Sequence, residues 1–138
     1  MLQRKQTLWL FLSSIFGLLQ IKFPVYHGEK IIESTLKYSE LNASSNIILL
    51  ILVISAAVIS ILTIFMFKNR KSQMGYTFIA IAISAGNIYY YWYLIKDFSQ
   101  GNYSITVIFP LLIPVLLILA FIGILKDERL VKSLDRLR

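Results

Sequence analysis

The sequence of 138 residues contains no cysteine and a single histidine, His27. Without cysteine the chain has no disulfide, no thiolate metal site and no cysteine nucleophile. His27 beside Glu29 and Glu33 supplies too few ligands at any recognised spacing, so we expect no metal site and a solvated loop instead. The apolar runs also lack a carboxylate pair, a serine next to a histidine and a glycine-rich phosphate loop. We therefore expect neither an enzyme nor a cofactor.

Charge is missing from four long stretches, which are residues 7–21, 46–67, 72–95 and 103–125. The second and third, of 22 and 24 residues, would rise about 33–36 Å as helices and so cross a hydrocarbon core of about 30 Å. Because 57% of the residues are hydrophobic, the composition indicates one integral membrane domain over residues 1–138. The sequence predicts an all-α bundle of four transmembrane helices.

Basic residues set the expected orientation of this bundle. Lys68, Arg70 and Lys71 occupy the short turn between the second and third runs. A turn with three positive charges stays on the cytoplasmic side, so both termini are expected to be cytoplasmic. Ten of the 14 Lys and Arg residues then face the cytoplasm. The net charge of +7 thus reflects membrane topology, and we expect no nucleic-acid partner.

The connections between the runs are short except for residues 22–45. The first run resembles a signal peptide, but no small-x-small cleavage site follows it, so a retained first helix is expected. The loop at 22–45 fits either a small hairpin or a short surface helix over Ile31–Leu41. Residues 96–102 are read as a brief turn.

Small and polar residues within the runs predict how the helices pack. Ala56 and Ser60, and likewise Ala82 and Gly86, form small-xxx-small pairs, which let helices approach closely. We expect both pairs to pack inside the bundle rather than at a dimer contact. Asn87 is the polar residue most costly to leave unpaired in lipid, so it should face another helix. A contact with a substrate is the alternative for Asn87.

The third and fourth runs carry aromatic and proline patterns. Tyr89–Tyr93 is a sequence of five aromatic residues at the end of the third run, which is typical of an interfacial belt, with a binding surface as the alternative. Pro110 and Pro114 lie four residues apart in the fourth run. They predict a local kink, with a hinge as the alternative.

Residues 126–138 form a charged tail whose leucines and valine recur at helical spacing. This pattern predicts an amphipathic cytoplasmic helix. Three readings stay open: the helix continues the last run, lies on the membrane surface, or docks a partner.

The two ends of the chain resemble a bacterial membrane-protein family known from the Bacteroidetes group and recorded as a domain of unknown function. The resemblance rests on residues 3–7 (Gln-Arg-Lys-Gln-Thr), 126–128 (Lys-Asp-Glu) and 135–138 (Asp-Arg-Leu-Arg). It implies a four-span protein of the bacterial cytoplasmic membrane. It brings no activity, cofactor or catalytic residue.

Both motifs lie on the expected cytoplasmic side, where opposite charges come together. The candidate residues for a partner-docking surface, or for a clamp between the first and fourth helices, are Arg4, Lys5, Asp127, Glu128, Asp135 and Arg136.

We expect an accessory or assembly subunit of an inner-membrane complex, because the runs carry no charge and the polar motifs are confined to one side. Its partners would be the lipid bilayer and other membrane subunits, or further copies of the chain. The alternative is a small transporter, channel or lipid-handling protein that uses Asn87, the proline pair and the aromatic run.

Overall fold

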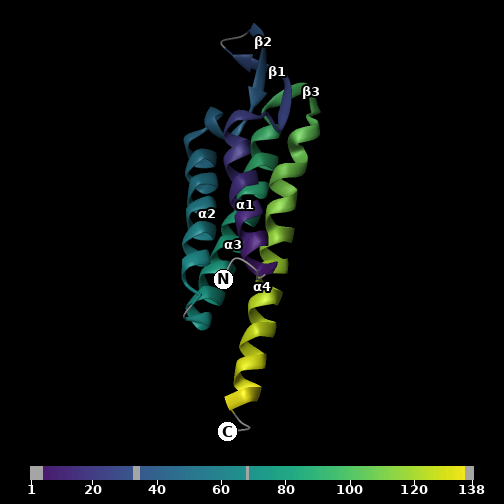
Figure 1. Cartoon of the computed structure of the whole chain (residues 1–138). Coiled ribbons are helices and arrows are strands. Elements are labelled where there is room, and N and C mark those ends of the chain that lie inside the picture. The colour runs from purple at the N-terminus through teal and green to yellow at the C-terminus, as the bar shows by residue number, and fades with distance from the viewer. Residues whose placement is uncertain (1–4, 33–34, 68, 136–138) are drawn as a thin grey trace.

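The structure, a computed structural model, describes residues 5–32, 35–67 and 69–135. Most of them lie in four helices packed side by side (Figure 1), which are α1 (Lys5–Lys22), α2 (Ile47–Phe65), α3 (Arg70–Ile95) and α4 (Ile108–Asp135). α1 and α3 each pack against both α2 and α4. The helices therefore form a ring in which α1 and α3 are diagonal to each other.

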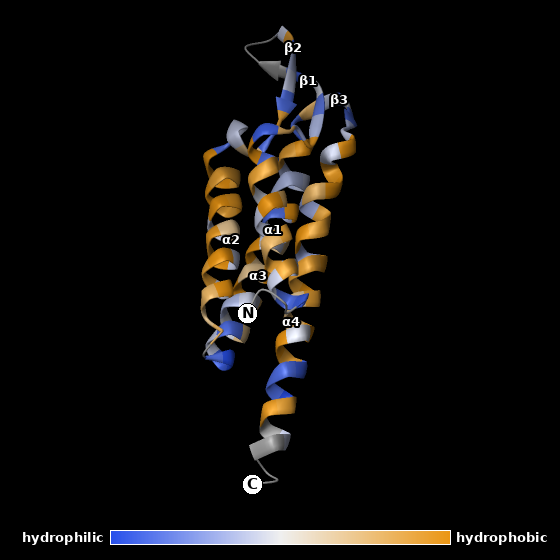
Figure 2. Ribbon diagram, viewed as in Figure 1, coloured by the Kyte–Doolittle hydropathy of each residue, from blue (hydrophilic) through white to orange (hydrophobic). Residues whose placement is uncertain are grey.

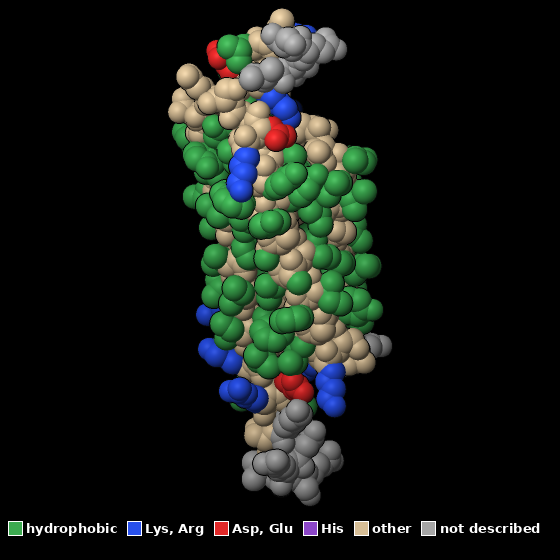
Figure 3. Space-filling view, turned by 180° about the vertical axis from the view of Figure 1, so that it is seen from behind, with side chains coloured by type: hydrophobic (Ala, Val, Ile, Leu, Met, Phe, Trp, Pro, Cys, Tyr) green, Lys and Arg blue, Asp and Glu red, His purple; other side chains and the backbone are tan. Residues whose placement is uncertain are grey.

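The outer surface of the helices is an apolar band. Hydrophobic residues cover the middle of the helices, while Lys and Arg gather toward the two ends (Figures 2 and 3). Three helical segments are long and apolar enough to cross a membrane, namely α2, α3 and residues 105–131. These features indicate a membrane protein. α1 does not reach that hydropathy because it carries Lys5 and Gln6 near its start and Gln20 and Lys22 near its end.

Local sequence accounts for where the helices begin and end. α1 stops before Pro24, which lacks a backbone N–H and restricts the residue before it. At the start of α2, Asn46 Oδ1 accepts a hydrogen bond from Ile48 N at 2.9 Å. At the start of α3, Asn69 Oδ1 accepts from Ser72 N at 3.3 Å. These asparagines cap the two helices by satisfying free backbone donors.

A small antiparallel sheet covers one end of the bundle, so the all-α prediction is wrong in this respect. Its strands are β1 (Tyr26–Ile32), β2 (Thr35–Leu41) and β3 (Phe98–Tyr103), in the order β2-β1-β3. Of the two predictions for residues 22–45, the hairpin is confirmed and the helix over 31–41 is wrong. Residues 96–102, predicted as a brief turn, contribute most of β3, which joins the hairpin because β1 offers it a free edge.

The two ends of the bundle are named here by what they carry. The sheet end holds β1, β2 and β3, and the basic end holds the α2–α3 turn, the start of α1 and the end of α4 (Figure 1). At the sheet end Lys30 Nζ lies 3.2 Å from Asp97 Oδ2. This ion pair fastens β1 to the turn between α3 and β3.

Glycine allows β1 and β3 to lie close together. Gly28 faces Gly101 in the register of the two strands. A Cβ at Gly101 would lie 2.6 Å from the carbonyl oxygen of His27 and 2.7 Å from the Tyr26 ring. The two strands pair at this point because neither position has a side chain.

The fourth helix differs from its predicted range at both ends. Residues 105–107 form a short 3-10 helix, η2 (Ile105–Val107), and a similar one, η1 (Ala43–Ser45), precedes α2. α4 then begins at Ile108 and continues without a break through Asp135. The tail is thus an extension of the last helix. Pro110 falls in its first turn, and Pro114 lies within the helix.

Candidate functional sites

Buried polar residues form a seam inside the bundle. We call this set the interior polar seam, and its members lie on α1, α2 and α3: Gln6, Ser13, Ser14, Gln20, Ser60, Thr63, Gln73, Thr77, Ser84 and Asn87, each at most 5% exposed. Many large apolar side chains of the same helices face outward, such as Phe11, Ile51 and Phe78, which are more than half exposed. A helix with a polar inner face and an apolar outer face suits a lipid environment, where polar groups must find partners within the protein.

Most hydroxyl groups of the seam satisfy themselves on their own helix. Ser13 Oγ donates to Leu10 O, and Ser84 Oγ donates to Ile81 O, both at 2.8 Å. Ser60 Oγ donates to the carbonyl of Ala56, also at 2.8 Å. Hydrogen bonds of this kind to a preceding carbonyl are common for Ser and Thr inside helices.

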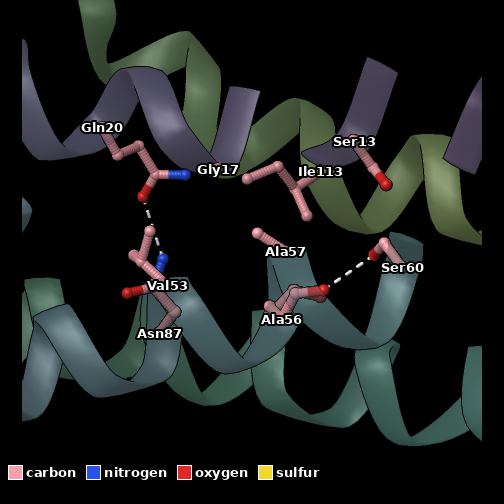
Figure 4. Close-up of a pocket in the computed structure, with 10 residues that line it drawn as sticks. Ser13, Gly17, Gln20, Val53, Ala56, Ala57, Ser60, Asn87 and Ile113 are labelled. Atoms are coloured by element: carbon pink, nitrogen blue, oxygen red, sulfur yellow. Dashed lines mark hydrogen bonds between the residues drawn. The ribbon is translucent and has the colours of Figure 1, made fainter. Parts of the chain in front are cut away.

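The amide pair of the seam joins two diagonal helices. Asn87 Nδ2 on α3 donates to Gln20 Oε1 on α1 at 3.0 Å, with both side chains buried (Figure 4). Asn87 therefore faces another helix rather than lipid. Its second polar atom, Oδ1, is buried and has no hydrogen-bond partner within the described residues. A buried acceptor left without a donor costs about 1–3 kcal/mol.

A small cavity adjoins this pair. Its volume is about 10 Å³, and its polar lining comes from Ser13, Gln20, Ser60, Ser84 and Asn87 (Figure 4). Gly17 of α1 also lines the cavity. Ile113 lines it from α4.

Gln20 is the functional candidate that the sequence reasoning missed. It lies near the end of the first apolar run, a position that indicates the polar boundary of a membrane span. The sequence signal was its spacing from Gln6, Ser13 and Gly17, which places the four residues on one helix face. The structure buries this face, which consists of Gln6, Leu10, Ser13, Ser14, Gly17 and Gln20. A mainly polar stripe along a helix rich in apolar residues predicts an inward-facing polar surface.

The two small-xxx-small pairs face opposite ways. Ala56 and Ser60 are buried, so their predicted internal packing is confirmed. Ala82 is exposed, and a Cβ built at Gly86 would meet nothing within 4 Å. The prediction of internal packing is therefore wrong for the Ala82–Gly86 pair, because α3 turns its polar face, with Ser84 and Asn87, toward the bundle.

At the basic end, an ion pair joins α3 to α4. Arg70 Nη1 lies 3.6 Å from Asp127 Oδ2, and both side chains are partly exposed. Lys5 is exposed at the start of α1, and Glu128 of α4 is half-buried. The other candidates of the predicted docking or clamp cluster are Arg4, Arg136 and the side chain of Asp135. These lie outside the residues that the structure describes.

The aromatic run of α3 divides between the protein interior and the outer surface. Tyr91 is 3% exposed and packs in a core with Val25 and Leu49, whereas Tyr89 is 64% and Tyr93 54% exposed. The run therefore contributes to the core of the sheet end as well as to the surface.

No three His, Asp or Glu side chains come together as a metal site in the part of the chain that the structure describes. The ring centroid of His27 lies 6.3 Å from that of Tyr38 on the neighbouring strand.

Comparison with family models gives a match to the one described as Domain of unknown function (DUF4293), and the match covers residues 2–137. No curated protein and no solved structure matches the chain.

Proposed function

The chain belongs to this family of unknown function, and from that premise we propose that it is an accessory or assembly subunit of a bacterial inner-membrane complex. In this proposal α3 binds a membrane helix of another subunit. The bacterial membrane rests on the resemblance of the two ends of the chain. The proposal assigns no catalytic residue and no cofactor.

The outward side of α3 carries the proposal. We define the α3 outer face as the residues that follow one side of the helix at alternating steps of four and three: Gly75, Ile79, Ala82, Gly86, Tyr89 and Tyr93. Ile79, Tyr89 and Tyr93 are 47%, 64% and 54% exposed. Small residues in the middle of such a face let a second helix approach closely, and the tyrosine hydroxyls at one end supply hydrogen bonds.

α3 is also the least covered of the three candidate spans. Only 22% of its most apolar stretch is buried, against 33% in α2 and in the segment of α4. Its average hydropathy is lowered by buried polar residues such as Gln73, Ser84 and Asn87, so the average does not describe its surface. The large uncovered side of α3 is what supports a protein partner along this helix.

Four membrane crossings are part of the proposal, and α1 is the crossing that needs support. Its 18 residues span about 27 Å as a helix. Its buried positions are mostly polar, while Leu8, Phe11 and Leu18 are each more than half exposed. The low average hydropathy of α1 thus comes from Lys5 and Lys22 at its two ends and from buried polar residues such as Gln6 and Gln20, and not from the side that faces outward.

The proposed orientation places the basic end in the cytoplasm, because most of the Lys and Arg residues gather there. α4 extends beyond the other helices at this end (Figure 1). On the extension, Leu130 is 63% and Val131 42% exposed. With the crossing proposed to end at Leu125, before the charged residues 126–129, this exposed apolar pair lies in the cytoplasm and supports a second contact, with a cytoplasmic part of the same complex.

The test is affinity purification of the tagged full chain from native membranes in mild detergent, followed by mass spectrometry. The variant Ala82→Leu/Gly86→Leu places bulky side chains on the α3 outer face without touching the seam. We expect a stoichiometric membrane partner with the wild type and its loss with this variant. Matched controls are Val58→Leu on α2 and Val115→Leu on α4, both at exposed positions, which should retain the partner.

Two results would overturn the proposal. One is a wild-type protein that purifies without any partner subunit. The other is a partner that stays bound equally to the wild type, to Ala82→Leu/Gly86→Leu and to the controls.

The alternative, a small transporter or channel, would use the interior polar seam. Against it stands the volume of the cavity beside Asn87, about 10 Å³, which is close to the minimum for one water molecule. We therefore place transport second.

A further inference from the structure

The cavity beside Asn87 has the size and surroundings of a site for one small polar molecule. Its volume of about 10 Å³ is at the lower limit of the space that a single water needs. It lies among the helices, with its lining drawn from α1, α2, α3 and α4. A ligand larger than water would have to displace side chains.

The hydrogen-bonding groups around the cavity define what the guest must offer. Each serine hydroxyl has one hydrogen, and Ser13, Ser60 and Ser84 each donate it to a carbonyl of their own helix. Their oxygen lone pairs therefore remain as acceptors. Asn87 Oδ1 is a further acceptor, buried and unpartnered within the described residues. The guest must therefore be able to donate hydrogen bonds, while lone pairs of its own would suit the N–H groups of Gln20, which also lines the cavity.

A neutral donor fits better than a cation. No carboxylate is among the residues that line the cavity. A positive charge within a membrane-spanning bundle is costly without a counter-charge, even where several oxygens surround it. Water supplies two hydrogens, carries no net charge and matches the volume.

We propose that this cavity binds a single structural water molecule, which donates one hydrogen to Asn87 Oδ1 and the other to Ser84 Oγ. Ser84 precedes Asn87 by three residues on the same face of α3, so the two acceptors are neighbours. With Asn87 Nδ2 bound to Gln20 Oε1, the water supplies the donor that Asn87 Oδ1 lacks.

Gly17→Ala is the sharpest test, because it fills the cavity without a clash. A Cβ at Gly17 would lie 3.5 Å from Ala57 Cβ, an ordinary contact. If a water occupies the cavity, the new methyl group displaces it and leaves Asn87 Oδ1 without a donor. If the cavity holds nothing, the methyl group fills a void and the protein becomes more stable. The two cases thus predict opposite signs.

The measurement is the thermal unfolding midpoint of the purified full chain in detergent. Gly86→Ala is the matched control, because it makes the same change in a helix where a Cβ meets nothing within 4 Å. We expect the midpoint of Gly17→Ala to fall below that of Gly86→Ala by on the order of 5 °C. A Gly17→Ala midpoint equal to or above that of the control would overturn the proposal.

Two further measurements do not depend on that comparison. In solid-state NMR of the wild type in lipid, magnetisation should pass from water to the Asn87 side-chain amide, and Gly17→Ala should abolish the transfer. Absence of the transfer in the wild type would overturn the proposal.

Unfolding in sodium, potassium and choline chloride at equal ionic strength should give one midpoint. A midpoint that rises with one small cation would show that the cavity binds that cation rather than water, and would overturn the proposal.

Discussion

At the scale of single residues, Gln20 and Asn87 form a buried hydrogen bond between two helices of the bundle. Both side chains are at most 3% exposed, and Asn87 Nδ2 donates to Gln20 Oε1 between α3 and α1. Removing one partner leaves a buried polar atom of the other without this hydrogen bond, which costs more than the hydrogen bond itself.

We predict that Gln20→Leu and Asn87→Leu each lower the free energy of unfolding by about 1–3 kcal/mol. The double variant should lose less than the sum of the two, because it leaves no orphaned amide. Chemical denaturation in mixed micelles, analysed as a double-mutant cycle, measures the coupling. Strict additivity would show that the two side chains do not interact.

The glycines of the sheet end have no room for a methyl group. Gly101→Ala would place a Cβ 2.6 Å from the His27 carbonyl oxygen, so we expect loss of β1–β3 pairing and a cost of about 1–3 kcal/mol. Hydrogen–deuterium exchange should show faster exchange in β1 and β3. Gly75→Ala, where a Cβ meets nothing within 4 Å, is the control. Unchanged exchange in Gly101→Ala would mean that the strands are not paired as described.

The Arg70–Asp127 ion pair is partly exposed and therefore weak. Arg70→Gln should lower the free energy of unfolding by about 0.2–1 kcal/mol, and added salt should reduce the difference from the wild type. Lys71→Gln, at the exposed neighbouring position, should have no effect. A loss from Arg70→Gln that is unaffected by salt would indicate a role other than ion pairing.

At the scale of elements, the sequence determines the helices better than it determines the sheet. α2, α3 and most of α4 coincide with the uninterrupted apolar runs of the sequence, each of which is followed by a charged residue. Such runs leave few alternatives to a helix in a membrane. α1 is harder to recognise because its polar residues lower its average hydropathy. The positions of those polar residues, rather than their number, identify it.

β3 could not be predicted from its own residues. Its sequence Phe-Ser-Gln-Gly-Asn-Tyr contains no β-branched residue and resembles a turn. The strand exists because β1, far away in the chain, presents an unpaired edge beside it. Likewise, the Ala82–Gly86 spacing shows that two small residues share a face, but the buried Ser84 and Asn87 decide that this face points outward.

The crossing of α1 is testable because the chain has no cysteine. Single variants Lys5→Cys, Tyr38→Cys and Lys71→Cys introduce exposed thiols at the start of α1, in β2 and at the start of α3. With a membrane-impermeant maleimide on intact spheroplasts, we expect labelling of Tyr38→Cys alone. Disrupted membranes should expose all three. Equal labelling of Lys5→Cys and Tyr38→Cys in spheroplasts would contradict a crossing by α1.

At the scale of the whole molecule, the protein consists of two helical hairpins joined in two ways. α1 with α2 and α3 with α4 form the hairpins, which the α2–α3 turn links at the basic end. At the sheet end the pairing of β1 with β3 connects them without a covalent bond. The helix contacts of α1 with α4 and of α2 with α3 lie between these two connections.

We therefore predict that residues 1–67 and 69–138, co-expressed as separate chains, associate in the membrane. The helix contacts and the β1–β3 pairing should hold the two fragments together without the covalent connection of the turn. Co-purification through a tag on one fragment measures the association. Gly101→Ala in the second fragment should reduce the yield of the complex, whereas Gly75→Ala should not. Fragments that never co-purify would show that the covalent turn is required.

The position of β3 also sets the order in which the protein can be completed during synthesis. Lys30 of β1 pairs with Phe98 of β3, so β1 leaves the ribosome well before its second partner. At about 5–20 residues per second, the delay is about 3–14 s. During that interval α2 and α3 are synthesised while one side of β1 has open backbone groups, which are prone to non-native pairing. The sheet can thus close only after α2 and α3 have been made, and any slowing of translation between β1 and β3 should prolong the exposure of that edge.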